Sequence, residues 1–166
     1  MTVKTYPMKI LAALLLFLTL PVAAATLEGR VVGVSDGDTI TVLDRQNVQP
    51  RIRLSAIDAP EKAQPFGNRS KEHLSKWVYN RSVFVEWNKR DRYGRIVGQV
   101  LIDGHDAGLE QVRAGMAWWY RAYSKEQKPE ERELYERTEQ AAKELKVGLW
   151  RDTNPVPPWE WRRPPK

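Results

Sequence analysis

Three carboxylates in the first half of the chain could converge on one metal ion. Asp38 stands just after the turn pair Asp36-Gly37, and Asp58 and Glu61 follow the third predicted strand. Neighbouring antiparallel strands could bring these segments together, and their like charges would then need a cation. Oxygen ligands favour a hard ion, such as Ca²⁺, Mg²⁺ or Mn²⁺. Zinc is disfavoured, because the chain has no cysteine and only two histidines.

Two arginines lie close to these acids in the predicted elements. Arg53 is on the strand face opposite Ile52 and Leu54, so it points outward if those two residues fill a barrel. Arg95 begins a later strand, just after a Tyr-Gly turn. A guanidinium fork suits two phosphate oxygens at once. Two such forks beside a metal carboxylate site describe a phosphodiester site.

Each of these residues also has an ordinary structural interpretation. Asp38 alone fits turn chemistry, and Glu61 alone fits a charge in the first turn of a helix. Arg53 and Arg95 could form surface ion pairs with the same carboxylates. Spacing alone leaves both interpretations open, so the hypothesis of a site rests on the whole set.

Strand and helix patterns indicate the frame that would hold these residues. Alternating or β-branched runs predict five strands, and apolar residues at helical spacing predict three helices. The predicted strands are 27–34, 39–43, 51–56, 82–87 and 96–102, and the predicted helices are 67–80, 107–114 and 129–146. Five short strands, with a helix after the third and helices at the end, predict an α+β fold, a five-stranded OB-fold β-barrel with about three packed helices.

Three local details follow from the same patterns. The Asp36-Gly37 turn is expected to use the left-handed conformation that glycine accepts. Alternation over 51–56 places Ala56 with Leu54 on the face that fills the barrel. In the last helix, helical spacing is expected to turn six residues inward, namely Leu134, Tyr135, Thr138, Ala141, Ala142 and Leu145.

The two ends of the chain differ in composition from the 26–151 domain between them. Residues 1–25 have the layout of a secretory signal peptide, with Lys4 and Lys9, an apolar run and small residues up to Ala25. The alternative is a membrane anchor, for which the apolar stretch is short. Residues 152–166 are rich in proline and tryptophan and are expected to be extended. We interpret this tail as a strap that packs its tryptophans on the barrel; the alternative is an additional stacking or cell-envelope contact.

Length and charge are consistent with one exported domain. Removal of 25 of the 166 residues leaves 141, which is enough for one domain with a core. The net charge is +6, or +4 without Lys4 and Lys9, a modest excess that weakly favours a polyanionic partner. Because cysteine is absent, stability must come from packing rather than disulfides.

Three blocks of sequence resemble the staphylococcal nuclease (thermonuclease) family. They are Val34-Ser35-Asp36-Gly37-Asp38-Thr39, Arg53-Leu54-Ser55-Ala56-Ile57-Asp58-Ala59-Pro60-Glu61 and Asp91-Arg92-Tyr93-Gly94-Arg95, in the family's order and with similar separations. Gly148-Leu149-Trp150 also resembles the exit from the family's last helix. The resemblance covers roughly Leu27 to Trp150, nearly the whole mature domain.

The resemblance implies an OB-fold barrel and Ca²⁺-dependent hydrolysis of DNA and RNA with little sequence preference. It implies one Ca²⁺ ion, with Mg²⁺ or Mn²⁺ less favoured. Asp38 and Asp58 match the family's metal carboxylates, and Ala59 matches the residue whose backbone carbonyl binds the metal. Asp36 matches a second acidic position near the metal, in its outer shell.

Other matched positions carry the reaction itself. Glu61 matches the proposed general base for the attacking water, and Arg53 and Arg95 match the phosphate-binding and transition-state arginines. Tyr120 or Tyr123 would stack the nucleotide, in a segment that matches only loosely and whose aromatics more often fill a core.

The chain departs from the family archetype at two places beside these residues. Ala59 replaces a threonine, which should preserve metal binding because the ligand is a backbone oxygen. The loop Lys62–Phe66, which borders the site, is shorter than in the archetype, and this affects the expected rate and substrate range.

The sequence therefore predicts an exported nuclease that hydrolyses phosphodiester bonds of DNA and/or RNA by metal-assisted in-line attack of water. After signal cleavage we expect a monomer without stable membrane association, in the periplasm or the extracellular medium. The alternative is a non-catalytic nucleic-acid-binding OB-fold module. A further alternative is an envelope-binding domain that uses the tail. The charged set favours the enzyme, because degenerate nuclease-like domains typically lose their carboxylates.

Overall fold

The structure is a computed structural model that describes residues 25–163. The predicted signal peptide therefore lies outside the described residues, except for Ala25, with which the first strand begins. The last three residues of the predicted tail lie outside them as well. Within residues 25–163, no helix has both the length and the apolar character needed to cross a membrane.

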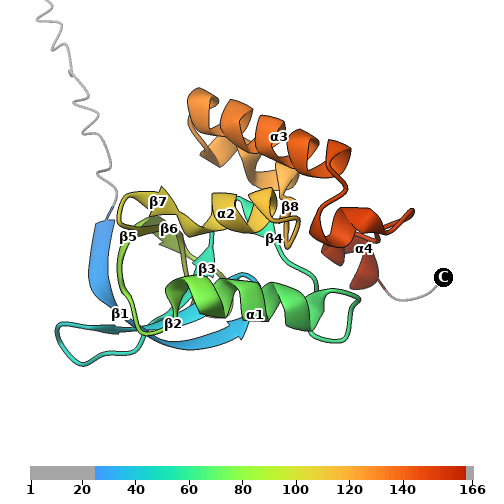
Figure 1. Cartoon of the computed structure of the whole chain (residues 1–166). Helices are drawn as coiled ribbons and strands as arrows, with labels where there is room; N and C mark the ends of the chain where they lie inside the picture. Colours follow the sequence, from blue (N-terminus) through green and yellow to red (C-terminus); the bar gives the residue numbers. More distant parts are fainter. Residues whose placement is uncertain (1–24, 164–166) are drawn as a thin grey trace, which may run out of the picture.

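Five strands form a closed barrel (Figure 1). They are β1 (Ala25–Asp36), β2 (Thr39–Asp44), β3 (Arg51–Leu54), β5 (Ser82–Arg90) and β6 (Ile96–Ile102). Neighbours pair antiparallel in the order β3-β2-β1-β5-β6, and a parallel pairing of β3 with β6 closes the sheet. The short strand β7 (His105–Asp106) extends the sheet beyond β6. The predicted five-stranded OB-fold barrel is confirmed.

Alternating apolar residues explain why the barrel closes around a core. On β6, every second residue from Ile96 to Ile102 is buried. On β3, Ile52 and Leu54 are buried and Arg53 between them is only partly covered. Because side chains along a strand alternate between faces, the register that buries Leu54 turns Arg53 out of the barrel.

The three predicted helices form, and two of them pack directly on the barrel. The three helices are α1 (Gly67–Val78), α2 (Ala107–Arg113) and α3 (Pro129–Glu144). Helix α1 buries Leu74 and Val78 and packs on β1, and α2 packs on β6. Helix α2 contacts both other helices and lies between them in Figure 1, so α3 forms an outer layer. Two 3₁₀ helices, η1 (Arg121–Glu126) and η2 (Gly148–Arg151), flank α3 in sequence.

A second, very small sheet fixes the segment after β3. The strand β4 (Ile57–Asp58) pairs antiparallel with β8 (Trp118–Trp119), so that Asp58 lies opposite Trp118. Buried Glu139 of α3 accepts a hydrogen bond from the Trp119 amide at 3.0 Å. Helix α3 therefore holds β8, and β8 holds the segment that carries Asp58.

Two of the predicted local details are wrong. Ala56 does not continue β3: it lies in a turn at φ 64 and is only partly buried. The turn is needed because the chain must leave the barrel and pair with β8. In α3, Tyr135 and Ala142 are buried as predicted, but Leu134 and Leu145 are exposed at 41% and 74%. The helix buries Glu139 on the same face, because this carboxylate has partners in Trp119 and Arg121.

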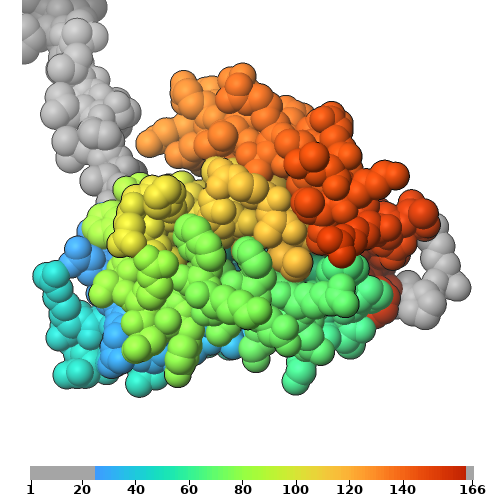
Figure 2. Space-filling view, in the orientation of Figure 1, coloured from blue at the N-terminus to red at the C-terminus, as the bar shows by residue number. Residues whose placement is uncertain are grey.

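The prediction that the tail is extended is wrong at Pro158–Trp161, which form the helical turn α4. A proline at the first helical position has a φ suited to a helix and lacks only an N–H that the helix would not use. Trp159 packs edge-on against Trp118, with ring centroids 6.4 Å apart. The predicted strap is therefore correct for one tryptophan, but its contact is with β8 rather than the barrel, and Trp161 is 44% exposed. Residues 152–163 are here called the C-terminal arm. Figure 2 places this arm against the body of the molecule, beside the segment that leads into α1. Gln64 in that segment donates to the Val156 carbonyl at 2.5 Å.

Candidate active site

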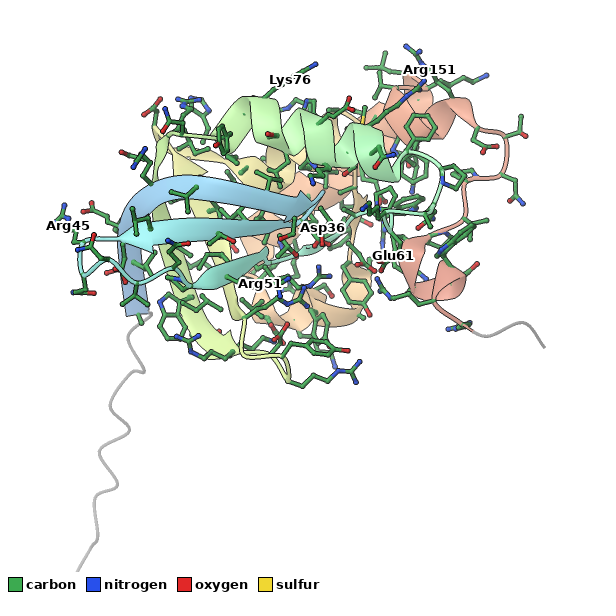
Figure 3. The ribbon with its side chains drawn as sticks, turned by 90° about the horizontal axis from the view of Figure 1, so that it is seen from below. Asp36, Arg45, Arg51, Glu61, Lys76 and Arg151 are labelled. Carbon is green, nitrogen blue, oxygen red and sulfur yellow. The ribbon has the colours of Figure 1, made fainter. Side chains whose placement is uncertain are left out.

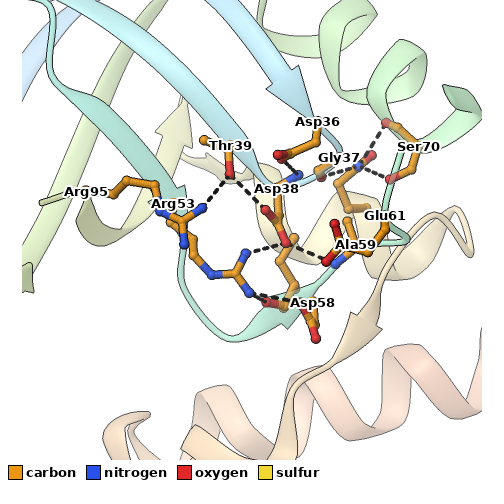
Figure 4. Close-up of polar contacts among 12 residues, drawn as sticks. Asp36, Gly37, Asp38, Thr39, Arg53, Asp58, Ala59, Glu61, Ser70 and Arg95 are labelled. Carbon is orange, nitrogen blue, oxygen red and sulfur yellow. Dashed lines mark hydrogen bonds and ion pairs between the residues drawn. The ribbon is translucent and has the colours of Figure 1, made fainter. Parts of the chain in front are cut away.

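The turn between β1 and β2 meets the end of β4 at one corner of the barrel (Figures 3 and 4). Asp38 Oδ2 accepts a hydrogen bond from the Ala59 amide at 3.0 Å, and the Asp38 carbonyl accepts one from the Leu54 amide at 2.8 Å. Asp38 and Asp58 are 5% and 0% exposed. The fold thus brings together Asp36, Asp38, Asp58 and Ala59, the residues predicted to lie near a metal.

Gly37 shapes this corner by its size. A Cβ atom there would lie 1.8 Å from Ser70 Oγ and 2.8 Å from Ala59 Cβ. Gln111 of α2 donates to the Gly37 carbonyl at 2.7 Å and to the Ser70 carbonyl at 3.1 Å. Gly37 is not among the glycines with positive φ. The predicted left-handed turn is therefore wrong, and glycine is required because the turn is pressed against α1.

Arg53 lies between the two buried aspartates. Its Nη2 donates to Asp58 Oδ1 at 3.0 Å, and its Nη1 pairs with Asp38 Oδ2. Burial raises the pKa of Asp38, but the Arg53 charge and the Ala59 amide outweigh this effect and hold it below its usual value. Burial also raises the pKa of Asp58 and is the larger effect there, although Arg162 and Arg53 oppose it. Arg53 therefore does form ion pairs with the carboxylates, as the structural alternative expected. These pairs are largely buried and lie at the predicted site rather than on the surface.

Arg95 approaches the same corner from the start of β6. Its Nε donates to Asp91 Oδ2 at 2.7 Å, and its Nη1 donates to Thr39 Oγ1 at 3.3 Å. The Thr39 hydroxyl in turn donates to Asp38 Oδ1 at 2.9 Å. Burial raises the pKa of Asp91, but the hydrogen bonds from Arg95 and from nearby amides together outweigh this effect. The pKa of Asp91 therefore lies below its usual value. Asp91 thus fixes the base of the Arg95 fork, and its tip points toward Thr39 (Figure 4).

Glu61 is much more exposed than Asp38 and Asp58, with 41% of its side chain accessible. Its amide donates to Gln64 Oε1 at 3.1 Å. Its carboxylate accepts a hydrogen bond at 2.7 Å from Arg162, a residue of the C-terminal arm. Sequence patterns gave no signal for Arg162, because it follows a Pro/Trp segment without periodicity and lies 101 residues beyond Glu61.

These side chains border one cleft of about 890 Å³. Asp36, Asp38 and Glu61 line it together with five arginines, which are Arg53, Arg90, Arg92, Arg95 and Arg162. Figure 3 shows Asp36 and Glu61 at the same end of the barrel. Tyr93, Tyr120 and Tyr123 also line the cleft. It combines acids, guanidinium groups and aromatic rings, as a nucleotide site requires.

Comparison with known proteins decides the family. The sequence profile described as "Staphylococcal nuclease homologue" matches residues 51–152. An uncharacterized endonuclease of Haemophilus influenzae is 40% identical over 159 residues, which cover 95% of this chain and 86% of that protein. An uncharacterized endonuclease of Escherichia coli is 43% identical over 155 residues (93% and 97%). A micrococcal nuclease of Shigella flexneri is 41% identical over 165 residues (93% and 91%).

The chain belongs to the staphylococcal nuclease family. It is therefore a nuclease, a hydrolase that acts on phosphodiester bonds, and its substrate is nucleic acid. Nucleases of this family are generally metal-dependent.

The donor atoms at the corner fit a hard cation in chemical type. Asp36, Asp38, Asp58 and the Ala59 carbonyl offer only oxygen, which Ca²⁺ and Mg²⁺ prefer. Burial and the neighbouring Asp38 charge raise the pKa of Asp36 to about 6, so its negative charge is poorly compensated. Yet no three Asp, Glu or His side chains in residues 25–163 are arranged around a common metal position. Asp38 and Asp58 are turned instead toward arginines.

The two tyrosines predicted to stack the nucleotide differ in their surroundings. Tyr120 is stacked on Trp159 of the C-terminal arm, with ring centroids 5.4 Å apart and an angle of 28° between planes. Tyr123 is 51% exposed and lies under the Lys89 ammonium, 4.7 Å from the ring centroid. The two tyrosine rings also meet edge to face, with centroids 5.2 Å apart. Tyr120 thus has a stacked partner in Trp159, whereas Tyr123 is the more exposed of the two rings.

Asp36→Asn is expected to stabilise the metal-free protein at pH 7 by about 1–2 kcal/mol, below the upper bound of about 3 kcal/mol set by the pKa difference. Folded Asp36 holds its proton to about pH 6, whereas an ordinary Asp releases it near 3.8. Raising the pH between these values therefore favours unfolding in the wild type, and the amide lacks the unfavourable charge. Urea unfolding in chelator measures the gain, which should vanish below pH 4. An equal gain at both pH values would contradict this explanation.

Proposed function

We propose that this nuclease is exported, depends on Ca²⁺, and cuts DNA and/or RNA with little sequence specificity by in-line attack of water. The observation that carries the proposal is that Asp38, Arg53 and Arg95 line one cleft, and that Arg53 also pairs with Asp58, which is buried beside it. Opposite charges in one polar cleft suit a phosphodiester, which needs both a cation and hydrogen-bond donors.

Asp38, Asp58 and the backbone carbonyl of Ala59 would hold the cation, with Asp36 behind them. Asp38 and Ala59 already touch through a hydrogen bond, so their two chain segments are positioned by the fold. When bound, Ca²⁺ supplies positive charge that stabilises the developing phosphate charge and helps orient the attacking water. Ala59 in place of threonine leaves this ligand intact, because only its backbone oxygen is used.

Glu61 is the proton acceptor in this proposal. As the water oxygen bonds to phosphorus, its proton passes to the Glu61 carboxylate, and the bond from phosphorus to the leaving nucleoside oxygen breaks. The partial exposure of Glu61 at the cleft wall suits contact with water. Arg53 and Arg95 hold the non-bridging phosphate oxygens, with Arg95 oriented through its Nε bond to Asp91.

Export is inferred from the signal-peptide layout of residues 1–25, with cleavage after Ala24 or Ala25. The mature protein is then expected in the periplasm or the medium, as a monomer and without a stable membrane contact. The intact mass of the protein recovered outside the cytoplasm tests this part of the proposal.

Glu61→Gln is expected to slow cleavage of single-stranded DNA by about 10²–10⁴-fold, the usual contribution of a general base. The amide keeps the shape of the side chain but cannot take the proton. Rates are measured on the purified mature protein in Ca²⁺ and again in chelator, where wild-type cleavage should stop.

Glu86→Gln is the matched control, because Glu86 is an exposed acid that lines the same cleft on β5. It should cleave at the wild-type rate. Undiminished cleavage by Glu61→Gln, or by the wild type in chelator, would overturn the mechanism. Binding of DNA by the wild type in Ca²⁺ without cleavage would favour the non-catalytic binding module.

A further inference from the structure

The C-terminal arm reaches the corner of the barrel that holds Asp36, Asp38 and Asp58, here called the acidic corner, and it is anchored there at several points. The Val156 carbonyl accepts a hydrogen bond from Gln64 at 2.5 Å. Trp159 stacks on Tyr120, and the helical turn α4 then brings Arg162 over the carboxylates. The arm thus contributes Arg162 to the lining of the cleft.

Arg162 binds two of the acids through both terminal nitrogens. Its Nη2 donates to Asp58 Oδ2 at 2.6 Å, and its Nη1 donates to Asp58 Oδ1 at 3.2 Å and to Glu61 Oε1 at 2.7 Å. Arg53 also donates to Asp58 Oδ1. Both oxygens of Asp58 are therefore engaged by guanidinium groups, and this side chain is 0% exposed although Arg162 itself is 43% exposed.

This arrangement conflicts with a cation on Asp58. A divalent ion would need at least one Asp58 oxygen and would then lie beside the Arg162 charge, and like charges at such short range repel strongly. The present contacts explain why the corner is electrostatically tolerable without a metal. Asp38, Asp58 and Glu61 pair with the positive charges of Arg53 and Arg162.

We propose that the C-terminal arm is a metal-sensitive latch, in which Arg162 occupies Asp58 and Glu61 until a divalent cation displaces it. The inference rests on the proposed function, since it takes Asp58 as a metal ligand and Glu61 as the base. While the latch is closed, Arg162 blocks both groups at once. The arm therefore sets the cation concentration at which the nuclease becomes active.

The expected effect follows from the population of the open state. A ligand that binds only the open state has its apparent affinity lowered by the fraction of molecules that are open. Bidentate contact with a buried carboxylate is stronger than an ordinary surface ion pair, so the closed form should dominate. Removing Arg162 should then raise Ca²⁺ affinity by roughly tenfold or more.

The first test is calorimetric titration of Ca²⁺ into metal-free mature protein without substrate. Arg162→Ala should lower the Kd for Ca²⁺ by roughly tenfold relative to the wild type. Arg163→Ala is the matched control: Arg163 is the exposed neighbour, the charge change is the same, and the Kd should not change. Arg162→Gln, which keeps a neutral donor for Asp58, guards against loss of folding and should fall between the wild type and Arg162→Ala.

Equal Kd values for Arg162→Ala and Arg163→Ala would overturn the latch and leave the proposed function standing. Weaker Ca²⁺ binding by Arg162→Ala would also overturn it, since Arg162 would then support the metal. Failure of every variant, and of the wild type, to bind Ca²⁺ would overturn the proposed metal dependence together with this inference.

The second test follows the arm itself, because coupling between two sites is reciprocal. The chain has no cysteine, so Arg163→Cys provides a single position for a nitroxide label. Addition of Ca²⁺ should increase the mobility of the label in its electron spin resonance spectrum. In the Arg162→Ala background the label should already be mobile in chelator. A spectrum that Ca²⁺ leaves unchanged, at a concentration shown by calorimetry to saturate the protein, would overturn the latch.

Discussion

Arg95→Ala should lower kcat for single-stranded DNA by about 10³–10⁵-fold, the range known for arginines that stabilise a phosphoryl transition state. Asp91 binds Arg95 through Nε, so the terminal nitrogen Nη1 is directed toward Thr39 and does not pair with a carboxylate. Within residues 25–163, the ion pair lost is the one with Asp91, which is part-buried in a turn, and its loss should cost about 1 kcal/mol. The variant should therefore unfold at nearly the wild-type temperature, and rate and melting are measured on the same preparation in Ca²⁺.

Two further variants separate charge from shape at this position. Arg95→Lys keeps the charge but loses the fork and should recover only part of the rate. Arg92→Ala removes an exposed arginine of the same turn, which contacts the Tyr93 hydroxyl at 2.8 Å, and should have a small effect. A normal rate in Arg95→Ala would remove this residue from the mechanism, and a large drop in melting temperature would assign the loss to folding instead.

The barrel could be predicted because its strands are buried on one face only. On β6 the alternation of buried and partly buried residues is unbroken from Ile96 to Ile102, and such a period is visible in sequence. The same alternation predicted that Arg53 leaves the barrel. It failed at Ala56, where the chain turns through a left-handed residue to join β4, because no periodic signal marks the end of a four-residue strand.

The elements that position Asp58, which are β4, β8 and helix α3, could not be assigned this role from sequence patterns. Strands β4 and β8 have two residues each and are far apart in the chain, so neither shows a period. Glu139 is buried and binds the Trp119 amide and Arg121, yet it lies among the many charges of α3 and resembles an exposed residue in the sequence. Its burial depends on partners that only the tertiary fold supplies.

The acidic corner was predicted through its motifs, but the charges that balance it were not. The sequence placed Asp38, Asp58 and Arg53 near one another and left two interpretations for the arginine. The structure unites them, because Arg53 forms ion pairs within the very cluster predicted to bind metal. Arg162 is the residue that the sequence could not reveal, since its contact with Asp58 spans 104 residues and depends on how the arm docks.

Arg53→Ala should destabilise the metal-free protein by about 3–5 kcal/mol, the usual result of leaving buried charges without their partner. Asp38 and Asp58 are both buried, and Arg53 is the one side chain in residues 25–163 that forms ion pairs with both. Urea unfolding in chelator measures this loss. Arg51→Ala is the matched control, because Arg51 lies on the same strand and is exposed, and it forms no ion pair within residues 25–163.

Ca²⁺ should recover part of the stability of Arg53→Ala, because a cation on the same aspartates would supply the missing positive charge and binds only the folded state. The gain on adding Ca²⁺ should therefore be larger in Arg53→Ala than in Arg51→Ala, whereas cleavage stays impaired by about 10²–10³-fold because the phosphate loses one electrostatic donor. This split between recovered stability and lost rate is the signature of a residue that balances the metal-free corner and also binds phosphate. Equal unfolding of the two variants in chelator would show that Asp38 and Asp58 do not depend on Arg53. Full recovery of cleavage in Ca²⁺ would restrict Arg53 to a structural role.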